Sequence, residues 1–71
     1  MDRAILYEEY KEGVHCVQLR TQCTKEDVKR ILATLKSPYR VRIITNDLTI
    51  IKLGFKMVSR QCIGGIYIKD G

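Results

Sequence analysis

The sequence predicts a small α+β domain in which one helix packs on one face of an antiparallel sheet of four to five strands. The prediction depends on three observations. The chain has only 71 residues, one central segment shows helical periodicity, and the segments on both sides of it alternate apolar and polar residues. The expected order is ββαββ, with a further short C-terminal strand as an option. We expect a single domain over residues 1–71, because this length is near the lower limit for an independent fold.

The first two expected strands span residues 4–10 and 14–21, which are rich in strand-forming side chains. The three-residue loop between them ends in Gly13, which suits a type I turn followed by a bulge. This loop pairs the strands so that their more apolar face turns toward the core. The residues on that face are Ile5, Tyr7, Val17 and Leu19, with Glu9 opposite His15 at its end.

The helix is expected over residues 25–36. Thr24 is a suitable N-cap, and Asp27 three positions later resembles a capping box in which Asp replaces Glu or Gln. Four apolar residues then recur at helical spacing and form one stripe: Val28, Ile31, Leu32 and Leu35. Pro38 ends the helix, since the residue before a proline disfavours the helical region.

Residues 39–45 and 49–58 both alternate and predict two further strands. A three-residue loop over 46–48 gives one apolar and one basic face, although Leu48 is a poor residue for a left-handed turn position. In this register Ile43 lies opposite Ile51 and Arg42 opposite Lys52. Residues 59–63 and 66–69 flank Gly64-Gly65, which predicts either a tight hairpin or a bulge within one edge strand.

The expected core combines the inward face of the strands with the apolar stripe of the helix. Its members are Ile5, Tyr7, Val17, Leu19, Val28, Ile31, Leu32, Leu35, Val41, Ile43, Ile51, Leu53 and Phe55.

The charge is unevenly distributed along the chain. The net charge is +5, of which residues 1–37 carry +1 (seven basic, six acidic) and residues 38–71 carry +4 (six basic, two acidic). A basic half favours an anionic partner such as nucleic acid. The alternative is that the charge only keeps a small protein in solution.

The basic face of the second strand pair is the first candidate site. Its cations would lie on one rigid surface and could meet successive phosphates. No aromatic residue is expected on this face, which favours backbone contact over base reading. The candidate nucleic-acid-binding residues are Arg40, Arg42, Lys52, Lys56 and Arg60.

An apolar outer surface is the second candidate site. One helix covers one side of a small sheet, so apolar residues on the other side would form an exposed patch typical of an interface. The residues expected there are Ile44, Ile50, Tyr10 and Val14. They indicate a protein–protein interaction module (an inhibitor, an adaptor or a self-associating regulator) with an acidic or apolar protein partner, or a homodimer.

Nothing in the sequence predicts an enzyme, a cofactor or a metal site. The spacings of the three cysteines, Cys16, Cys23 and Cys62, do not resemble the paired CxxC ligands of a zinc site, their number is odd, and His15 is the only histidine. Cys23 precedes the helix cap, but no base accompanies it in the local sequence. We therefore expect free thiols in a cytoplasmic protein without a membrane span, and a non-enzymatic binding or regulatory role. The element order is common to many small domains and indicates no particular family.

Overall fold

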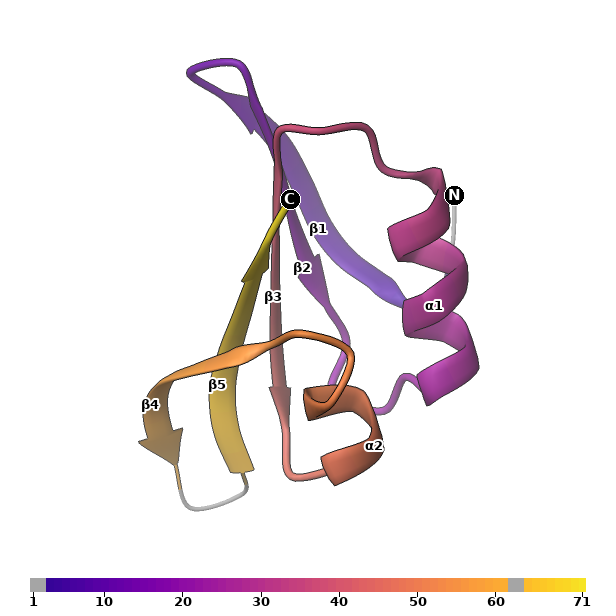
Figure 1. Cartoon of the computed structure of the whole chain (residues 1–71), viewed down its shortest axis with the longest axis vertical. Helices are drawn as coiled ribbons and strands as arrows, with labels where there is room; N and C mark the ends of the chain where they lie inside the picture. Colours follow the sequence, from indigo (N-terminus) through magenta and orange to yellow (C-terminus); the bar gives the residue numbers. More distant parts are fainter. Residues whose placement is uncertain (1–2, 62–63) are drawn as a thin grey trace.

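The computed structural model describes residues 3–61 and 64–71, which form a five-stranded mixed sheet with helices on one side (Figure 1). The predicted α+β class is confirmed. The strand order in the sheet is β1-β2-β3-β5-β4. The elements are β1 (Ile5–Lys11), β2 (Val14–Leu19), α1 (Lys25–Thr34), β3 (Tyr39–Thr45), α2 (Leu48–Ile51), β4 (Lys56–Gln61) and β5 (Gly64–Asp70).

Helix α1 begins at the predicted capping box. The Asp27 amide donates to Thr24 Oγ1 at 3.2 Å, and the Thr24 amide donates to Asp27 Oδ2 at 3.0 Å. Arg30 donates to the other oxygen of the same carboxylate at 3.0 Å. These donors hold the pKa of Asp27 below its usual range, because they stabilise the ionised form.

The connection through α1 makes β2 and β3 parallel, so the prediction of an antiparallel sheet is wrong at this pair. The chain leaves the end of β2, passes through the helix and re-enters the sheet at the end where β2 began. A crossover of this kind is what joins adjacent parallel strands. The other three strand pairs are antiparallel.

The predicted register of the first hairpin is wrong by one residue. Lys11 faces Val14, and the two residues between them, Glu12 and Gly13, have φ values of 54° and 80°. Two consecutive positive φ values fit a two-residue type I′ turn, which matches the twist of the strands. The slip moves Tyr7 to the opposite face, where it is 55% exposed.

A bulge between Ile5 and Tyr7 absorbs the extra residue, so that Ile5 still pairs with Leu19 as predicted. The inward face of β2 is therefore confirmed. Beyond the bulge, each side chain of β1 points to the face opposite the predicted one.

Residues 48–51 form helix α2 instead of the start of a strand, so the predicted pairing of Ile43 with Ile51 and of Arg42 with Lys52 is wrong. Asp47 caps this turn. Its Oδ1 accepts from the Thr49 amide at 2.9 Å and from Thr49 Oγ1 at 2.6 Å. The local hydrogen bonds turn the chain away from β3, which pairs with β2 and β5 instead.

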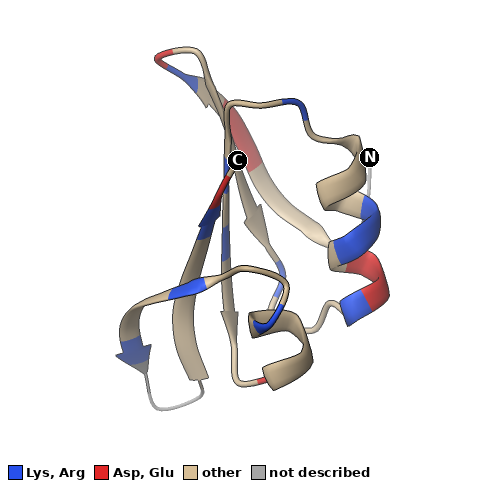
Figure 2. Cartoon of the chain, viewed as in Figure 1, with Lys and Arg blue, Asp and Glu red and all other residues tan. Residues whose placement is uncertain are grey.

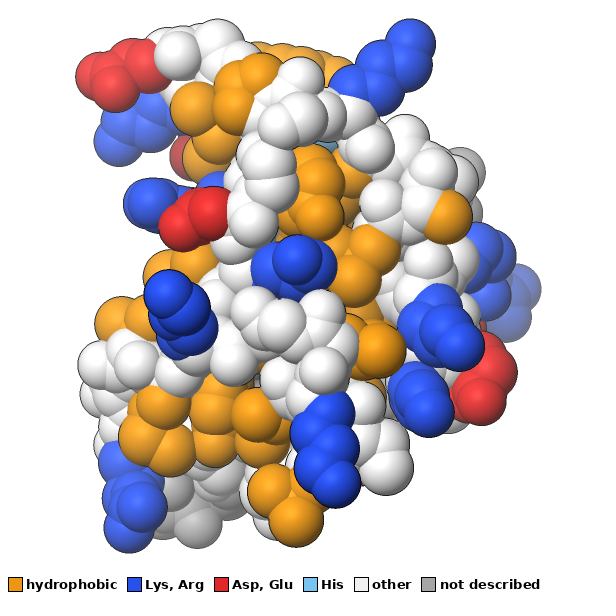
Figure 3. Space-filling view, in the orientation of Figure 1, with side chains coloured by type: hydrophobic (Ala, Val, Ile, Leu, Met, Phe, Trp, Pro, Cys, Tyr) orange, Lys and Arg blue, Asp and Glu red, His pale blue; other side chains and the backbone are white. Residues whose placement is uncertain are grey.

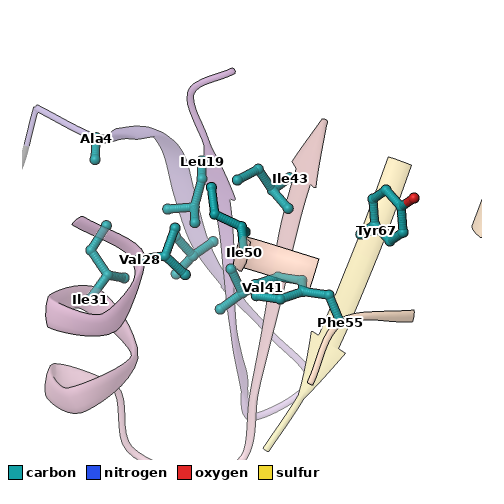
Figure 4. Close-up of a cluster of buried hydrophobic side chains, with 10 residues drawn as sticks. Ala4, Leu19, Val28, Ile31, Val41, Ile43, Ile50, Phe55 and Tyr67 are labelled. Atoms are coloured by element: carbon teal, nitrogen blue, oxygen red, sulfur yellow. The ribbon is translucent and has the colours of Figure 1, made fainter. Parts of the chain in front are cut away.

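The core lies between the sheet and the two helices, where side chains from both layers meet (Figure 4). Most of the predicted core is buried or partly buried there, and Tyr7 is the exception. The buried core residues that the sequence analysis did not include are Ala4, Ile50 and Tyr67.

The C-terminal segment forms an antiparallel hairpin, which was the first of the two predicted options. Gln61 faces Gly64 and both glycines belong to β5, so the predicted position of the turn at Gly64-Gly65 is wrong; residues 62–63 lie outside the described residues. A Cβ at position 65 would lie 2.7 Å from the Tyr67 ring, so any larger residue there would displace this buried side chain.

Ile50 should anchor α2 to the core. Its side chain is 1% exposed, whereas Leu48 in the same helix is 68% exposed. We expect Ile50→Val to lower the free energy of unfolding by about 1 kcal/mol, because it leaves a small cavity. Leu48→Ala removes more atoms but should change that energy by less than about 0.5 kcal/mol. Urea denaturation measures both, and a larger effect at Leu48 would contradict this packing of α2.

The capping aspartates should make the free energy of unfolding depend on pH in the acidic range. The pKa of Asp47, like that of Asp27, is lowered, chiefly by its hydrogen bonds with Thr49. A lowered folded-state pKa stabilises the fold above the unfolded pKa of about 3.9, and this stabilisation is lost as the pH falls further.

We therefore expect the free energy of unfolding to decline below about pH 4. The double variant Asp27→Asn, Asp47→Asn should lose less over the same range, because neither side chain titrates. Urea denaturation across a pH series measures this, and superimposable pH profiles for the two proteins would refute it.

Candidate functional site

No described element covers the sheet face opposite the two helices, and we call this surface the open face (Figure 1). Strand alternation defines its members, because successive side chains point to opposite sides and Val17, Leu19, Val41, Ile43 and Tyr67 point into the core. The residues that register and alternation place on the open face are Tyr7, Glu9, Lys11, Val14, Cys16, Gln18, Arg40, Arg42, Ile44, Lys56, Ser59, Ile66, Ile68 and Asp70.

A row of paired residues crosses the middle of the open face from edge to edge, and we call it the central row. It consists of Tyr7, Gln18, Arg42, Ile68 and Lys56, each the register partner of the next. Within the described part of the chain, Arg42 and Lys56 form neither a hydrogen bond nor an ion pair of their side chains. The row therefore carries an aromatic ring and an amide at one end and two unbalanced cations toward the other.

The acidic residues of the open face lie beside the central row. Asp70 accepts from Arg40 Nε at 2.8 Å, and this partner raises the pKa of Arg40. Glu9 Oε2 accepts from the Tyr7 hydroxyl at 2.6 Å, which raises the pKa of Tyr7. The charge of Arg40 is thus offset locally, which leaves Arg42 and Lys56 as the free cations of the central row.

An isoleucine cluster adjoins the central row at the end where β5 begins. Ile44 pairs with Ile66, which is 6% exposed although it is not part of the core under the helices. Ile68 of the central row follows Ile66 on the same face. Figure 3 shows hydrophobic side chains at the surface over β4, but Met57, which is 50% exposed, pairs with Tyr67 and lies on the side of the helices.

The structure brings together only part of the predicted basic site. Arg40, Arg42 and Lys56 share the open face, but Lys52 follows α2 as its C-cap and is not in the sheet. Arg60 lies opposite Gly65, on the side of the helices, because a bulge between Met57 and Ser59 shifts the register of β4. All the charged residues of β4 are nevertheless basic (Figure 2).

The predicted apolar interface is also divided. Ile44 and Val14 are partly buried on the open face, whereas Ile50 lies in the core at 1% exposed and is not available to a partner. Tyr10 is 78% exposed but lies on the other side of the sheet, stacked on His15 with ring centroids 4.4 Å apart. The two-residue turn and helix α2 account for both differences.

Tyr7 and Gln18 on the central row are the residues that the sequence analysis missed. Gln18 was given no role, and Tyr7 was expected in the core. The signal that could have found Tyr7 is Glu12-Gly13, read as a two-residue turn.

A second basic cluster lies where three separate segments meet, near the start of α1. Arg3, Arg20 and Arg30 line a hollow of about 460 Å³ together with Asp27. Arg20 Nε donates to the Arg3 carbonyl at 2.8 Å, and Arg30 pairs with Asp27. No local pattern links these arginines in the sequence, since only the fold brings them together.

The reactive side chains of the described residues do not assemble into a catalytic or metal-binding set. Burial and the nearby Asp27 raise the pKa of the Cys23 thiol, so it stays protonated near neutral pH. Cys16 is also a free thiol, and Cys62 lies outside the described residues. His15 Nε2 lies 2.9 Å from Glu8 Oε2 instead of pairing with Glu9.

Residues 3–61 and 64–71 contain no group of three His, Cys, Asp or Glu residues that could hold a metal ion. Neither α1 nor α2 has the length and apolar character needed to cross a membrane.

Comparisons with protein-family models, with curated proteins and with solved structures found no match to this chain.

Proposed function

We propose that this chain is a non-enzymatic nucleic-acid-binding module that contacts phosphates through the open face. The observation that carries the proposal is the presence of Arg42 and Lys56 on one row of an uncovered sheet, without acidic partners among the described residues. Phosphate contacts supply most of the affinity in nonspecific nucleic-acid binding.

The spacing of these cations supports the proposal. One strand, β5, separates β3 from β4, so the backbones of Arg42 and Lys56 lie roughly 10 Å apart across the sheet. Cations fixed at such intervals on a rigid surface can hold a phosphate backbone in register. Free thiols at Cys16 and Cys23 agree with a cytoplasmic setting for this binding.

Replacement of Arg42 tests the proposal. We expect Arg42→Ala to weaken binding of labelled oligonucleotides in fluorescence anisotropy and to reduce the slope of log K against log salt by about 1, because one phosphate contact is lost. The matched control is Lys29→Ala on the exposed side of α1, which should change neither quantity. Equal losses for the two variants, or no binding by the unmodified protein at ~50 mM salt, would contradict the proposal.

A protein–protein interaction module is the second candidate function, and the isoleucine cluster favours it. Ile44 and Ile68 are only partly buried on a face that no described helix covers, and they border the buried Ile66. Such apolar groups beside cations suit a second copy of the chain or an acidic or apolar protein surface.

Ile44→Asp separates the second candidate from the first. If the open face forms a homodimer, the unmodified protein should sediment as a dimer and Ile44→Asp as a monomer, because a buried, unpaired carboxylate is costly. Circular dichroism should show that the variant keeps its fold, since Ile44 lies outside the core under the helices. A monomeric unmodified protein at high concentration would exclude the homodimer.

A further inference from the structure

We infer that the nucleic acid bound by the open face is single-stranded and that one of its bases stacks on Tyr7. This inference rests on the proposed function and adds the class of nucleic acid and a second kind of contact. It depends on the width of the sheet, on the exposure and restraint of Tyr7, and on the charges on either side of that ring.

The width of the open face argues against insertion into a duplex. Five strands spaced about 4.8 Å apart span roughly 19 Å, whereas the major groove of B-DNA is about 12 Å wide. The central row therefore cannot enter a groove as a unit. A single strand has no such restriction, because its unstacked bases can turn toward a flat surface.

Tyr7 offers that surface a stacking platform. It is 55% exposed, and its hydroxyl is held by Glu9 at 2.6 Å. The hydrogen bond already restrains the side chain in the free protein, so stacking costs less conformational entropy than it would for a freely rotating ring. Aromatic side chains on an open sheet are a common means of holding single-stranded bases.

The charges around Tyr7 give the bound strand a direction across the sheet. Glu9, the residue next to Tyr7 on the open face of β1, repels phosphate, and Lys11 of the same face lies four residues from Tyr7 at the hairpin turn. Arg42 and Lys56 lie in the same row as Tyr7 toward the opposite edge and attract phosphate. The base should therefore lie over β1 and the phosphates over β3 and β4. Gln18 lies between the two zones and can both donate to and accept from a base edge.

The chain provides a matched pair of tyrosines for the test. Tyr7 and Tyr10 both belong to β1 and are both exposed, but they lie on opposite sides of the sheet. Single-stranded RNA and DNA of about 12 nucleotides, and duplexes of the same length, would be titrated by fluorescence anisotropy. The proteins compared are the unmodified chain, Tyr7→Ala, Tyr7→Phe, Tyr10→Ala and Arg42→Ala, with Tyr7→Thr as a strand-favouring alternative should Tyr7→Ala unfold.

We expect Tyr7→Ala to weaken single-strand binding by roughly 5- to 150-fold, the range for loss of one stacked base, with no change in the salt slope. Tyr7→Phe should bind like the unmodified chain, because it keeps the ring, and Tyr10→Ala should also have little effect. The unmodified chain should bind single strands more tightly than duplexes.

The failure of this inference differs from the failure of the proposed function. If Arg42→Ala weakens binding but Tyr7→Ala does not, or if duplexes bind as tightly as single strands, the inference is wrong and the phosphate-binding proposal stands. If no oligonucleotide binds at low salt, both are wrong. If Tyr10→Ala weakens binding as much as Tyr7→Ala, the stacking site is not on the open face.

Discussion

Burial of the apolar stripe of α1 against one side of the sheet is the constraint on which the rest of this structure depends. Val28 and Ile31 are almost inaccessible, and they share a cluster with Leu19 of β2 and Val41 of β3. Because α1 connects these two strands, its packing makes them parallel neighbours at the centre of the sheet. The described part of this 71-residue chain has no second helical layer for the other side, so that side of the sheet is uncovered there.

Two short-range hydrogen-bonding patterns then decide which residues reach the open face. The Glu12-Gly13 turn sets the register of β1 and thereby exposes Tyr7. The Asp47 cap turns the chain into α2 and thereby buries Ile50. Both effects act over two or three residues, yet each moves a side chain from one environment to another. The composition of the open face therefore follows from turn chemistry as much as from strand patterns.

The parts of the fold with a strong local signal could be predicted from the sequence. The cap at Thr24, the stripe of α1 and the inward face of β2 and β3 all appear as expected, because periodicity and capping are local properties. The parallel pairing could not be predicted in the same way, since it depends on where the crossover returns. The strand predicted to begin at residue 49 does not form there. The adjacent apolar residues Ile50 and Ile51 also fit one helical turn once Asp47 provides a cap.

The candidate site was predicted in part for the same reason. Arg40 and Arg42 share a face because both belong to β3, and Lys56 joins them through β5. Lys52 and Arg60 do not, because α2 and the bulge in β4 interrupt the alternation. The Arg40–Asp70 pair joins residues thirty positions apart, and no sequence pattern showed that it would offset one of the three cations.

The central claim is that the open face, and not the helical side, contacts nucleic acid. Titration of the isotope-labelled protein with a short single-stranded oligonucleotide, followed by amide chemical shifts in NMR spectra, tests it most directly. The largest shifts should fall at Gln18, Arg42 and Ile68, while the amides of α1 stay in place. Shifts confined to α1 or to the arginine-lined hollow near its start, or no shifts at low salt, would contradict the account.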